Sequence, residues 1–357
     1  MRIATYITGH GYGHATRSLA VLRAIRVRDP DAWLAIRTMA PERFFREALA
    51  PPLHIERVQI DVGAIERDVL FTDPVATIAA LRELHSREEE IVSREVDFLH
   101  RQRVDIVLSD VPPLASEIAH RAGIPSVAIA NFTWDRIYED YPGSTDLVAR
   151  IRGFYAKTTL GLEVPLGHPI TAFPRKESIP IITRHPKAPR EETRAALGIA
   201  RDEFVVLVVL RGGELGSRSM APTPRGVRFV SFSPFHADRV LIPGPDWQDR
   251  FPDLVAASDV VFGKPGYGIV GECMAARRPL LHLPRGGFAE TPYLIEWMDR
   301  LMPHSRVEIL EAASPRFYDL ARDSASSGFV WPEVRLNGDG VAAEFVWKLL
   351  VSCKTSE

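Results

Sequence analysis

The feature that most constrains this fold is a glycine-rich turn that occurs twice, once in each half of the chain. The first turn, residues 8–17 (TGHGYGHATR), follows an apolar segment at 3–7 and precedes a helical pattern that starts at Ser18. The second turn, residues 263–272 (GKPGYGIVGE), follows the apolar segment 260–262. Glycine lets a backbone turn tightly and approach a ligand, and the start of a helix offers free N–H groups to an anion. Two such strand–turn–helix units predict two α/β domains that face each other across a cleft.

Length and charge narrow the class of protein further. A chain of 357 residues favours two domains, and its net charge of -2 creates no field that would attract nucleic acid, so we expect no nucleic-acid partner. No apolar run approaches the ~18 residues of a membrane-spanning helix, and a strand beginning at residue 2 leaves no room for a signal peptide. We therefore expect a cytoplasmic protein without a transmembrane segment, for which a peripheral membrane contact remains open.

Apolar segments alternate with helical patterns in both halves, which is typical of parallel sheets covered by helices on both faces. Strands are predicted at 2–8, 33–38, 54–59, 105–109 and 126–130, and then at 204–210, 228–232, 239–242, 259–262 and 280–283. The proline- and arginine-rich stretch 166–189 is predicted to be an interdomain linker whose charges are solvated. The expected domains are 1–165 and 190–340, followed by a C-terminal helix at 341–357 that packs back on the first domain.

The two turns resemble those of GT-B glycosyltransferases of the MurG-like and UDP-glycosyltransferase superfamily. Residues 13–20 resemble the acceptor-side turn of that fold, and residues 264–272 resemble its donor-side turn. Three longer segments, 9–17, 131–138 (NFTWDRIY) and 256–290, are similar to the glycosyltransferase-like N-terminal part of plant L-arabinokinases. The likeness covers nearly the whole chain but includes no second ATP-binding loop. It therefore implies a sugar-nucleotide fold with two Rossmann-like domains, and it does not imply a kinase.

The resemblance places His14 at the position that acts as general base in many GT-B families, where it deprotonates the acceptor hydroxyl. Such a histidine is usually oriented by a carboxylate. Asp110 follows the strand at 105–109, at the sheet edge where doubly wound folds bind ligands. We predict a His14–Asp110 dyad, with His10 as the next candidate base. The alternative is that His14 caps the turn and Asp110 caps the following helix.

On the donor side, the N–H groups of Gly266, Tyr267 and Gly268 open a helix and can hold a diphosphate. Glu272 matches the carboxylate that binds ribose hydroxyls in the superfamily. Glu290 is assigned either to sugar hydroxyls or to a helix macrodipole. The predicted donor-binding residues are Arg211, Gly212, Gly213, Lys264, Gly266, Tyr267, Gly268, Glu272, Arg285 and Glu290.

Asn131, Phe132 and Trp134 follow the strand at 126–130 and are assigned to the acceptor, although the two aromatic rings fit core packing equally well. The remaining histidines lack ligand spacing, so we expect neither a metal nor a cofactor. The sequence thus predicts a metal-independent, hexosyltransferase-type enzyme that moves a sugar from a nucleoside-diphosphate sugar, with UDP favoured, to an unidentified acceptor. A nucleotide-sugar hydrolase or epimerase on the same fold, and a non-catalytic binding module, are the alternatives.

Overall fold

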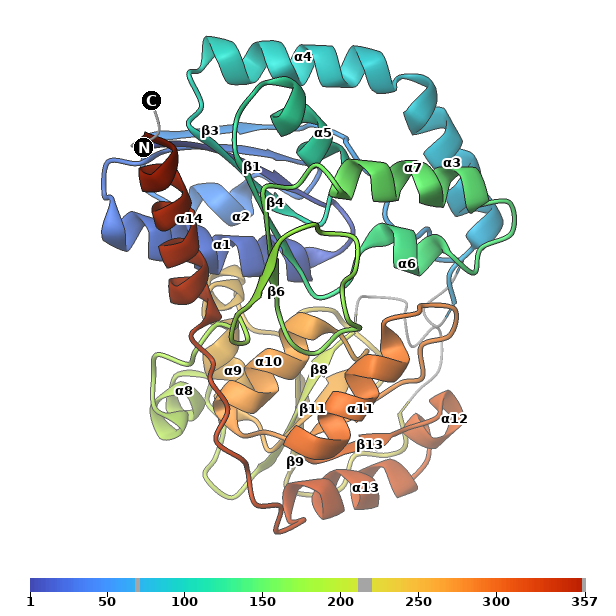
Figure 1. Cartoon of the computed structure of the whole chain (residues 1–357). Helices are drawn as coiled ribbons and strands as arrows, with labels where there is room; N and C mark the ends of the chain where they lie inside the picture. Colours follow the sequence, from blue (N-terminus) through green and yellow to red (C-terminus); the bar gives the residue numbers. More distant parts are fainter. Residues whose placement is uncertain (68–70, 211–219, 355–357) are drawn as a thin grey trace. The chain divides into compact units, whose positions relative to one another are not determined.

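The computed structural model describes residues 1–67, 71–210 and 220–354, and the chain divides into two compact units (Figure 1). The first unit comprises Met1–Glu66, Thr72–Thr183 and Arg335–Glu357. The second comprises Arg67–Phe71 and Arg184–Val334. Each unit is an α/β structure built on one parallel sheet.

The sheet of the first unit has seven strands in the order β3-β2-β1-β4-β5-β6-β7. Its strands are β1 (Arg2–Ile7), β2 (Trp33–Thr38), β3 (Leu53–Glu56), β4 (Ile106–Asp110), β5 (Ser126–Ala130), β6 (Leu160–Glu163) and β7 (Lys176–Ser178). Its helices are α1 (Tyr12–Arg28), α2 (Arg43–Arg46), α3 (Pro74–Ser86), α4 (Glu88–Arg101), α5 (Leu114–Arg121), α6 (Trp134–Tyr138), α7 (Thr145–Tyr155) and α14 (Gly338–Lys354). The direction in which strands are added reverses between β1 and β4, which makes their carboxyl ends the natural place for a ligand site.

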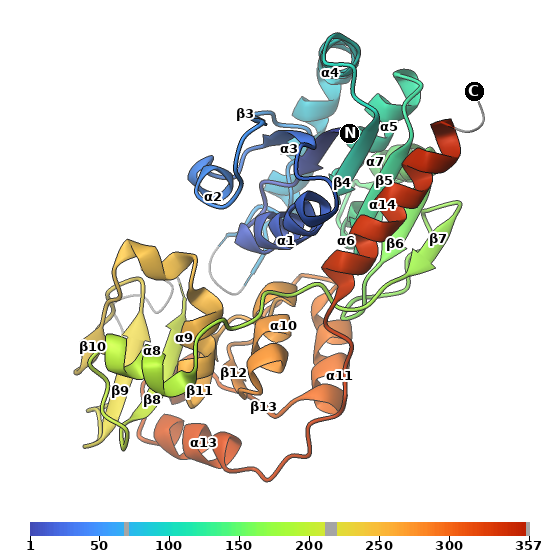
Figure 2. The same ribbon diagram turned by 90° about the vertical axis from the view of Figure 1, so that its left-hand side faces the viewer.

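Apolar side chains hold the helices of the first unit to its sheet. Ala4 and Tyr6 of β1 pack in one cluster with Val92 and Leu99 of α4 and with Ile118 of α5. Helix α1 contacts β1 and lies side by side with α14 (Figure 2). Segments distant in sequence therefore complete the same unit.

The first unit extends beyond the predicted boundary at residue 165. Strand β7, inside the stretch 166–189 that we predicted to be a linker, pairs with β6, so Lys176 lies opposite Gly161. All three residues of β7 are exposed, because it is an edge strand, and its sequence KES carries no apolar signal. Residues 166–183 of the predicted linker therefore belong to the first unit, and β7 adds an edge strand to its sheet.

The sheet of the second unit has six strands in the order β10-β9-β8-β11-β12-β13, with the reversal between β8 and β11. Its strands are β8 (Phe204–Val209), β9 (Val227–Ser231), β10 (Val240–Leu241), β11 (Val260–Gly263), β12 (Leu280–His282) and β13 (His304–Arg306). Its helices are α8 (Arg190–Ala196), the 3-10 helix η1 (Pro245–Gln248), α9 (Phe251–Ala257), α10 (Tyr267–Ala276), α11 (Thr291–Leu301), α12 (Ile309–Ala312) and α13 (Arg316–Ala325). Phe229 and Phe262 of the sheet pack with Phe317 of α13 in its core. None of the described helices is long and apolar enough to cross a membrane.

Candidate functional site

Helix α1 begins earlier than the sequence suggested, at Tyr12 and not at Ser18. Gly11 is its N-cap residue and has a φ of 76°, in the left-handed region that favours glycine. His14, Arg17 and Ser18 therefore lie within the helix at positions i, i+3 and i+4. Residues with this spacing share one face of a helix, so all three side chains can reach one partner.

That partner is Asp110, the last residue of β4. Ile7 of β1 pairs with Asp110, so the start of α1 and this carboxylate lie at the same edge of the sheet. His14 Nδ1 is 2.8 Å from Asp110 Oδ1, and Ser18 Oγ donates to Oδ2 at 2.9 Å. Arg17 donates from Nη2 to Oδ1 at 2.5 Å and from Nε to Oδ2 at 3.0 Å. The predicted pair thus lies in contact, within a network that also includes two residues the sequence analysis missed.

The electrostatics of this network define the state of the histidine. Burial raises the pKa of Asp110, but the charge of Arg17 and the hydrogen bond with His14 outweigh burial and hold this pKa well below its usual range. An ionised carboxylate only accepts hydrogen bonds, so the contact at 2.8 Å requires a proton on His14 Nδ1. In the neutral imidazole, Nε2 then carries the lone pair that can accept a proton.

The backbone next to Asp110 is strained. Val111 has a φ of 77°, a conformation that a β-branched residue rarely adopts. Its carbonyl oxygen accepts a hydrogen bond of 2.6 Å from the Tyr155 hydroxyl, which helps to hold this conformation. Strain of this kind is typical of functional sites, where the surrounding structure fixes a backbone that would otherwise relax.

The three residues assigned to the acceptor are buried in the first unit, with exposed fractions of 1% for Asn131, 2% for Phe132 and 0% for Trp134. Asn131 Oδ1 accepts a hydrogen bond of 2.6 Å from Arg17 Nη1. The ring of Phe132 meets His14 edge-on, with 5.6 Å between the ring centroids. The burial of the two aromatic rings fits core packing, the second of the two alternatives. Asn131 contacts Arg17 and Phe132 contacts His14, so both residues pack against the dyad.

His10 packs edge-on against Trp134, with 5.7 Å between ring centroids. Gly63 adjoins it closely, since a Cβ there would come within 2.6 Å of the His10 Cβ. Asp61 accepts hydrogen bonds from Thr8, from the Gly9 N–H and from Trp134 Nε1, the last at 3.2 Å. Burial raises the pKa of Asp61 to about 6. Sequence reasoning missed this acid, although its position after the strand predicted at 54–59 was a signal.

In the second unit, the turn after β11 leads into α10 as the sequence predicted. Gly266 is the N-cap of α10, and Tyr267 and Gly268 form its first turn, so their N–H groups lie at the positive end of the helix. The space beside Gly266 is open, since an added Cβ would meet nothing within 4 Å. Lys264 lies two residues before this N-cap. This arrangement suits an anion such as a diphosphate.

Glu272 lies in the second turn of α10 and pairs with Arg184. Arg184 Nε and Nη2 lie 2.7 and 2.6 Å from Glu272 Oε1. Burial raises the pKa of Glu272, although the positive charge of Arg184 acts in the opposite direction. Among the described residues, none donates a hydrogen bond to the second oxygen, Oε2. Arg184, which we predicted to be a solvated linker residue, is instead the partner of the predicted ribose-binding acid.

The remaining donor-side residues occupy the loop after β12 and the start of α11. The Arg285 guanidinium lies 4.0 Å from the centre of the Phe288 ring. Glu290 is buried at the N-cap position of α11, where the macrodipole explanation also applies. Arg211, Gly212 and Gly213 lie outside the described residues. Within the described part of the chain, no group of three His, Cys, Asp or Glu side chains could hold a metal ion.

Comparison with known proteins gives two sequence relatives, whereas no protein-family profile matches the chain. The chain is 33% identical over 303 residues to an L-arabinokinase of Arabidopsis thaliana, a match that covers 82% of this chain and 29% of that protein. It is 27% identical over 207 residues to MK0977, an uncharacterized glycosyltransferase of Methanopyrus kandleri, across 52% of this chain and 58% of that protein. The chain therefore spans less than two thirds of either relative.

Solved structures match nearly the whole chain. The glycosyltransferase SnogD of Streptomyces nogalater has a TM-score of 0.60 at 15% identity, over 98% of this chain and 99% of that chain. UGT89C1 of Arabidopsis thaliana, solved with UDP, has a TM-score of 0.56 at 16% identity, over 98% and 94%. The glycosyltransferase VinC, solved with dTDP, has a TM-score of 0.58 at 14% identity, over 98% and 95%. With its two parallel sheets and these neighbours, the chain belongs by its fold to the GT-B class of glycosyltransferase structures.

Proposed function

We propose that this protein transfers a sugar from a nucleoside-diphosphate sugar, with UDP favoured, to an acceptor hydroxyl. The observation that carries the proposal is the part-buried contact of 2.8 Å between Asp110 Oδ1 and His14 Nδ1, which assigns the lone pair of the neutral imidazole to Nε2. The nucleotide assignment draws on the neighbours solved with UDP and with dTDP. The acceptor is defined only by its chemistry, as a molecule with a hydroxyl that needs deprotonation.

In the proposed reaction, His14 Nε2 takes the proton of the acceptor hydroxyl while the acceptor oxygen forms a bond to the anomeric carbon. The bond between that carbon and the diphosphate oxygen breaks, and its electron pair leaves with the diphosphate. We assign the stabilisation of this charge to the N–H groups of Gly266, Tyr267 and Gly268, together with Lys264 and Arg285. Glu272 would hold the ribose hydroxyls through Oε2. The proposal needs no divalent ion.

Arg17 is proposed as a positioning residue of the dyad. Its fork fixes both oxygens of Asp110 and its third nitrogen holds Asn131, so the carboxylate cannot rotate away from His14. By keeping Asp110 ionised, Arg17 also keeps the His14 tautomer in which Nε2 carries the lone pair. Asp110 in turn stabilises the imidazolium that forms when the proton is transferred.

The test is incubation of the purified protein with a panel of nucleotide sugars, with and without a small-molecule cell extract, read by mass spectrometry. We expect a new sugar conjugate only with extract. Free sugar released without extract would favour a nucleotide-sugar hydrolase, an isomeric nucleotide sugar would favour an epimerase, and binding without turnover would leave a binding module.

The His14→Ala variant tests the base. Turnover should fall ~10²–10⁴-fold, the usual contribution of a general base, whereas donor affinity measured by calorimetry should not change. His120→Ala, a change of an exposed histidine on α5, is the matched control and should retain wild-type turnover. If His14→Ala keeps wild-type turnover while Glu272→Ala abolishes it, His14 is a structural residue and His10 becomes the next candidate.

A further inference from the structure

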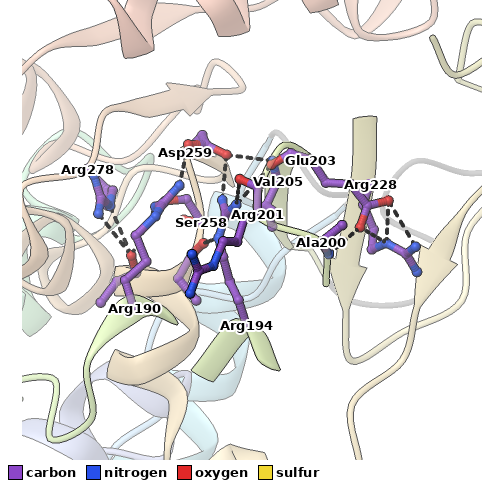
Figure 3. A network of polar contacts seen from close by, with 12 residues as sticks. Arg190, Arg194, Ala200, Arg201, Glu203, Val205, Arg228, Ser258, Asp259 and Arg278 are labelled. Atoms are coloured by element: carbon purple, nitrogen blue, oxygen red, sulfur yellow. Dashed lines mark hydrogen bonds and ion pairs between the residues drawn. The ribbon is translucent and has the colours of Figure 1, made fainter. Parts of the chain in front are cut away.

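A second cluster of charge lies in the second unit, at the amino ends of its strands. Asp259 precedes β11 and is the centre of the network in Figure 3. Its Oδ1 accepts from Arg190 at 2.6 Å, and its Oδ2 accepts from Arg194 at 2.8 Å and from the Val205 N–H at 2.7 Å. Both oxygens of this carboxylate are therefore engaged, and its charge is compensated by two arginines.

Two further arginines adjoin this network without a carboxylate bonded to them. Arg278 donates from Nε and Nη2 to the Ala256 carbonyl oxygen at 3.1 and 3.0 Å. Burial and the neighbouring charge of Arg190 lower the pKa of Arg278. Arg277, the C-cap of α10, is exposed and has a φ of 52°. Its guanidinium forms no hydrogen bond or ion pair with the residues that the structure describes. The cluster thus has an excess of positive charge.

Arg277 and Arg278 line a cavity of about 230 Å³. Its wall combines Arg277 and Arg278 with the hydroxyl-bearing Ser324 and with two aromatic side chains, Phe329 and Trp331, whose ring centroids are 5.8 Å apart. A volume of 230 Å³ is below the ~300–1,000 Å³ of sites for drug-sized ligands, so it suits a compound much smaller than a nucleotide sugar.

The cavity is separate from the donor turn. Its residues Asp259, Pro279 and Pro303 immediately precede β11, β12 and β13, so it lies at the amino ends of these parallel strands. The donor turn after β11 and the loop with Arg285 follow the carboxyl ends of β11 and β12. The cavity and the donor turn therefore lie at opposite ends of the strands, and one ligand cannot occupy both.

We propose that this cavity binds a small phosphorylated ring compound, of the size of a sugar phosphate. Guanidinium groups match the geometry and charge of a phosphate, aromatic side chains pack against the apolar faces of a sugar ring, and a serine can bind a ring hydroxyl. The site would let a phosphorylated metabolite bind the protein independently of the donor. It does not depend on the proposed function.

The test uses glucose 6-phosphate as the probe, with glucose and inorganic phosphate as comparison ligands, in calorimetry on the full chain. We expect saturable binding of glucose 6-phosphate, weaker binding of phosphate and none of glucose. Arg277→Ala should weaken binding at least about tenfold, the effect of a lost hydrogen bond to a charged group. Because the Arg277 side chain is exposed and unbonded in the described structure, this variant should fold normally.

Arg285→Ala is the matched control, since it removes an arginine near the donor turn and should leave glucose 6-phosphate binding unchanged. Tryptophan fluorescence should change on binding in the wild type and not in Trp331→Phe. The proposal is overturned if the wild type shows no saturable binding, if Arg277→Ala binds as tightly as the wild type, or if only Arg285→Ala loses binding. Equal affinity for inorganic phosphate and glucose 6-phosphate would overturn the assignment of a ring compound.

Discussion

Two buried carboxylates, one in each unit, lie near the carboxyl ends of the parallel sheets, and their surroundings differ. Asp110 accepts from His14, from Ser18 and twice from Arg17, so both of its oxygens are engaged. Glu272 is held by Arg184 through Oε1 alone. Burial raises the pKa of both groups, but only at Asp110 do the surrounding donors reverse the effect.

This difference supports the proposal that Asp110 positions the groups around it and that Glu272 binds a ligand. A carboxylate with every acceptor position filled cannot serve a ligand, and its value lies in fixing the groups around it. A carboxylate with one oxygen left over can still accept from a ligand hydroxyl. The Asp110 network is therefore complete without a ligand, whereas Glu272 keeps one oxygen that can accept a further hydrogen bond.

The largest effect should come from breaking the Asp110 network. Arg17→Met leaves a buried carboxylate without its main countercharge, and this should cost ~3–5 kcal/mol in the free energy of unfolding. Urea denaturation measures it, with Arg28→Met on an exposed position of the same helix as control. A loss below about 1 kcal/mol would show that Arg17 does not hold Asp110 as we describe.

A smaller effect is expected from replacing Glu272, and it should appear in ligand affinity. Glu272→Ala should weaken the affinity for a nucleoside diphosphate by ~1–3 kcal/mol, the size of a lost hydrogen bond to a charged group. Calorimetry with UDP measures this change. The exposed Glu296→Ala on α11 provides the control and should bind like the wild type. Unchanged affinity in a folded Glu272→Ala variant would exclude the ribose role.

The smallest expected effects are changes in the free energy of unfolding with pH. They should have opposite signs for Asp110 and Glu272. The lowered pKa of Asp110 gives stability that is present above its unfolded value of ~3.9 and is lost as pH falls through the folded value below it. The raised pKa of Glu272 gives stability that is present below its unfolded value of ~4.3 and is lost as pH rises through the folded value above it.

Unfolding measured between pH 3 and pH 7 should therefore show two trends. The stability advantage of the wild type over Asp110→Asn should shrink as pH falls below ~4, where the Asp110 carboxylate begins to bind a proton. Relative to the wild type, Glu272→Gln should gain stability as pH rises above ~4.3. Parallel trends in the two variants would mean that the carboxylates do not differ as the structure indicates.

Sequence reasoning found what depends on local pattern. Apolar runs that end in glycine or in a polar residue predicted most strands and both turns. Asp110 could be placed because a residue at the end of a parallel strand lies at the edge of the sheet where such folds bind ligands. The sequence missed β6, β7 and β13, whose sequences LGLE, KES and HSR contain no continuous apolar run. It also could not show that Glu272 pairs with Arg184, which lies 88 positions away.

Within the candidate site, one local error had a large consequence. Gly11 caps α1 without a side-chain hydrogen bond, and a glycine-rich start resembles a loop, so the helix was expected to begin at Ser18. With that start, the shared face of His14, Arg17 and Ser18 could not be recognised. Phe132 and Trp134 illustrate a second limit, since an aromatic residue after a strand has the same pattern whether it is buried or exposed.

The contact between α1 and α14 has a consequence for the order of events during synthesis. Ala342, Ala343 and Val346 of α14 are buried, and Gly338 N–H donates to the Ile181 carbonyl oxygen at 3.0 Å. The ribosome makes these residues only after all of residues 184–334. The second unit is nearly continuous in sequence, so it can fold before α14, the last helix of the first unit, has been synthesised. A nascent chain arrested before α14 would carry the His14 helix with its outer face uncovered, and it would need a chaperone more than the finished protein does.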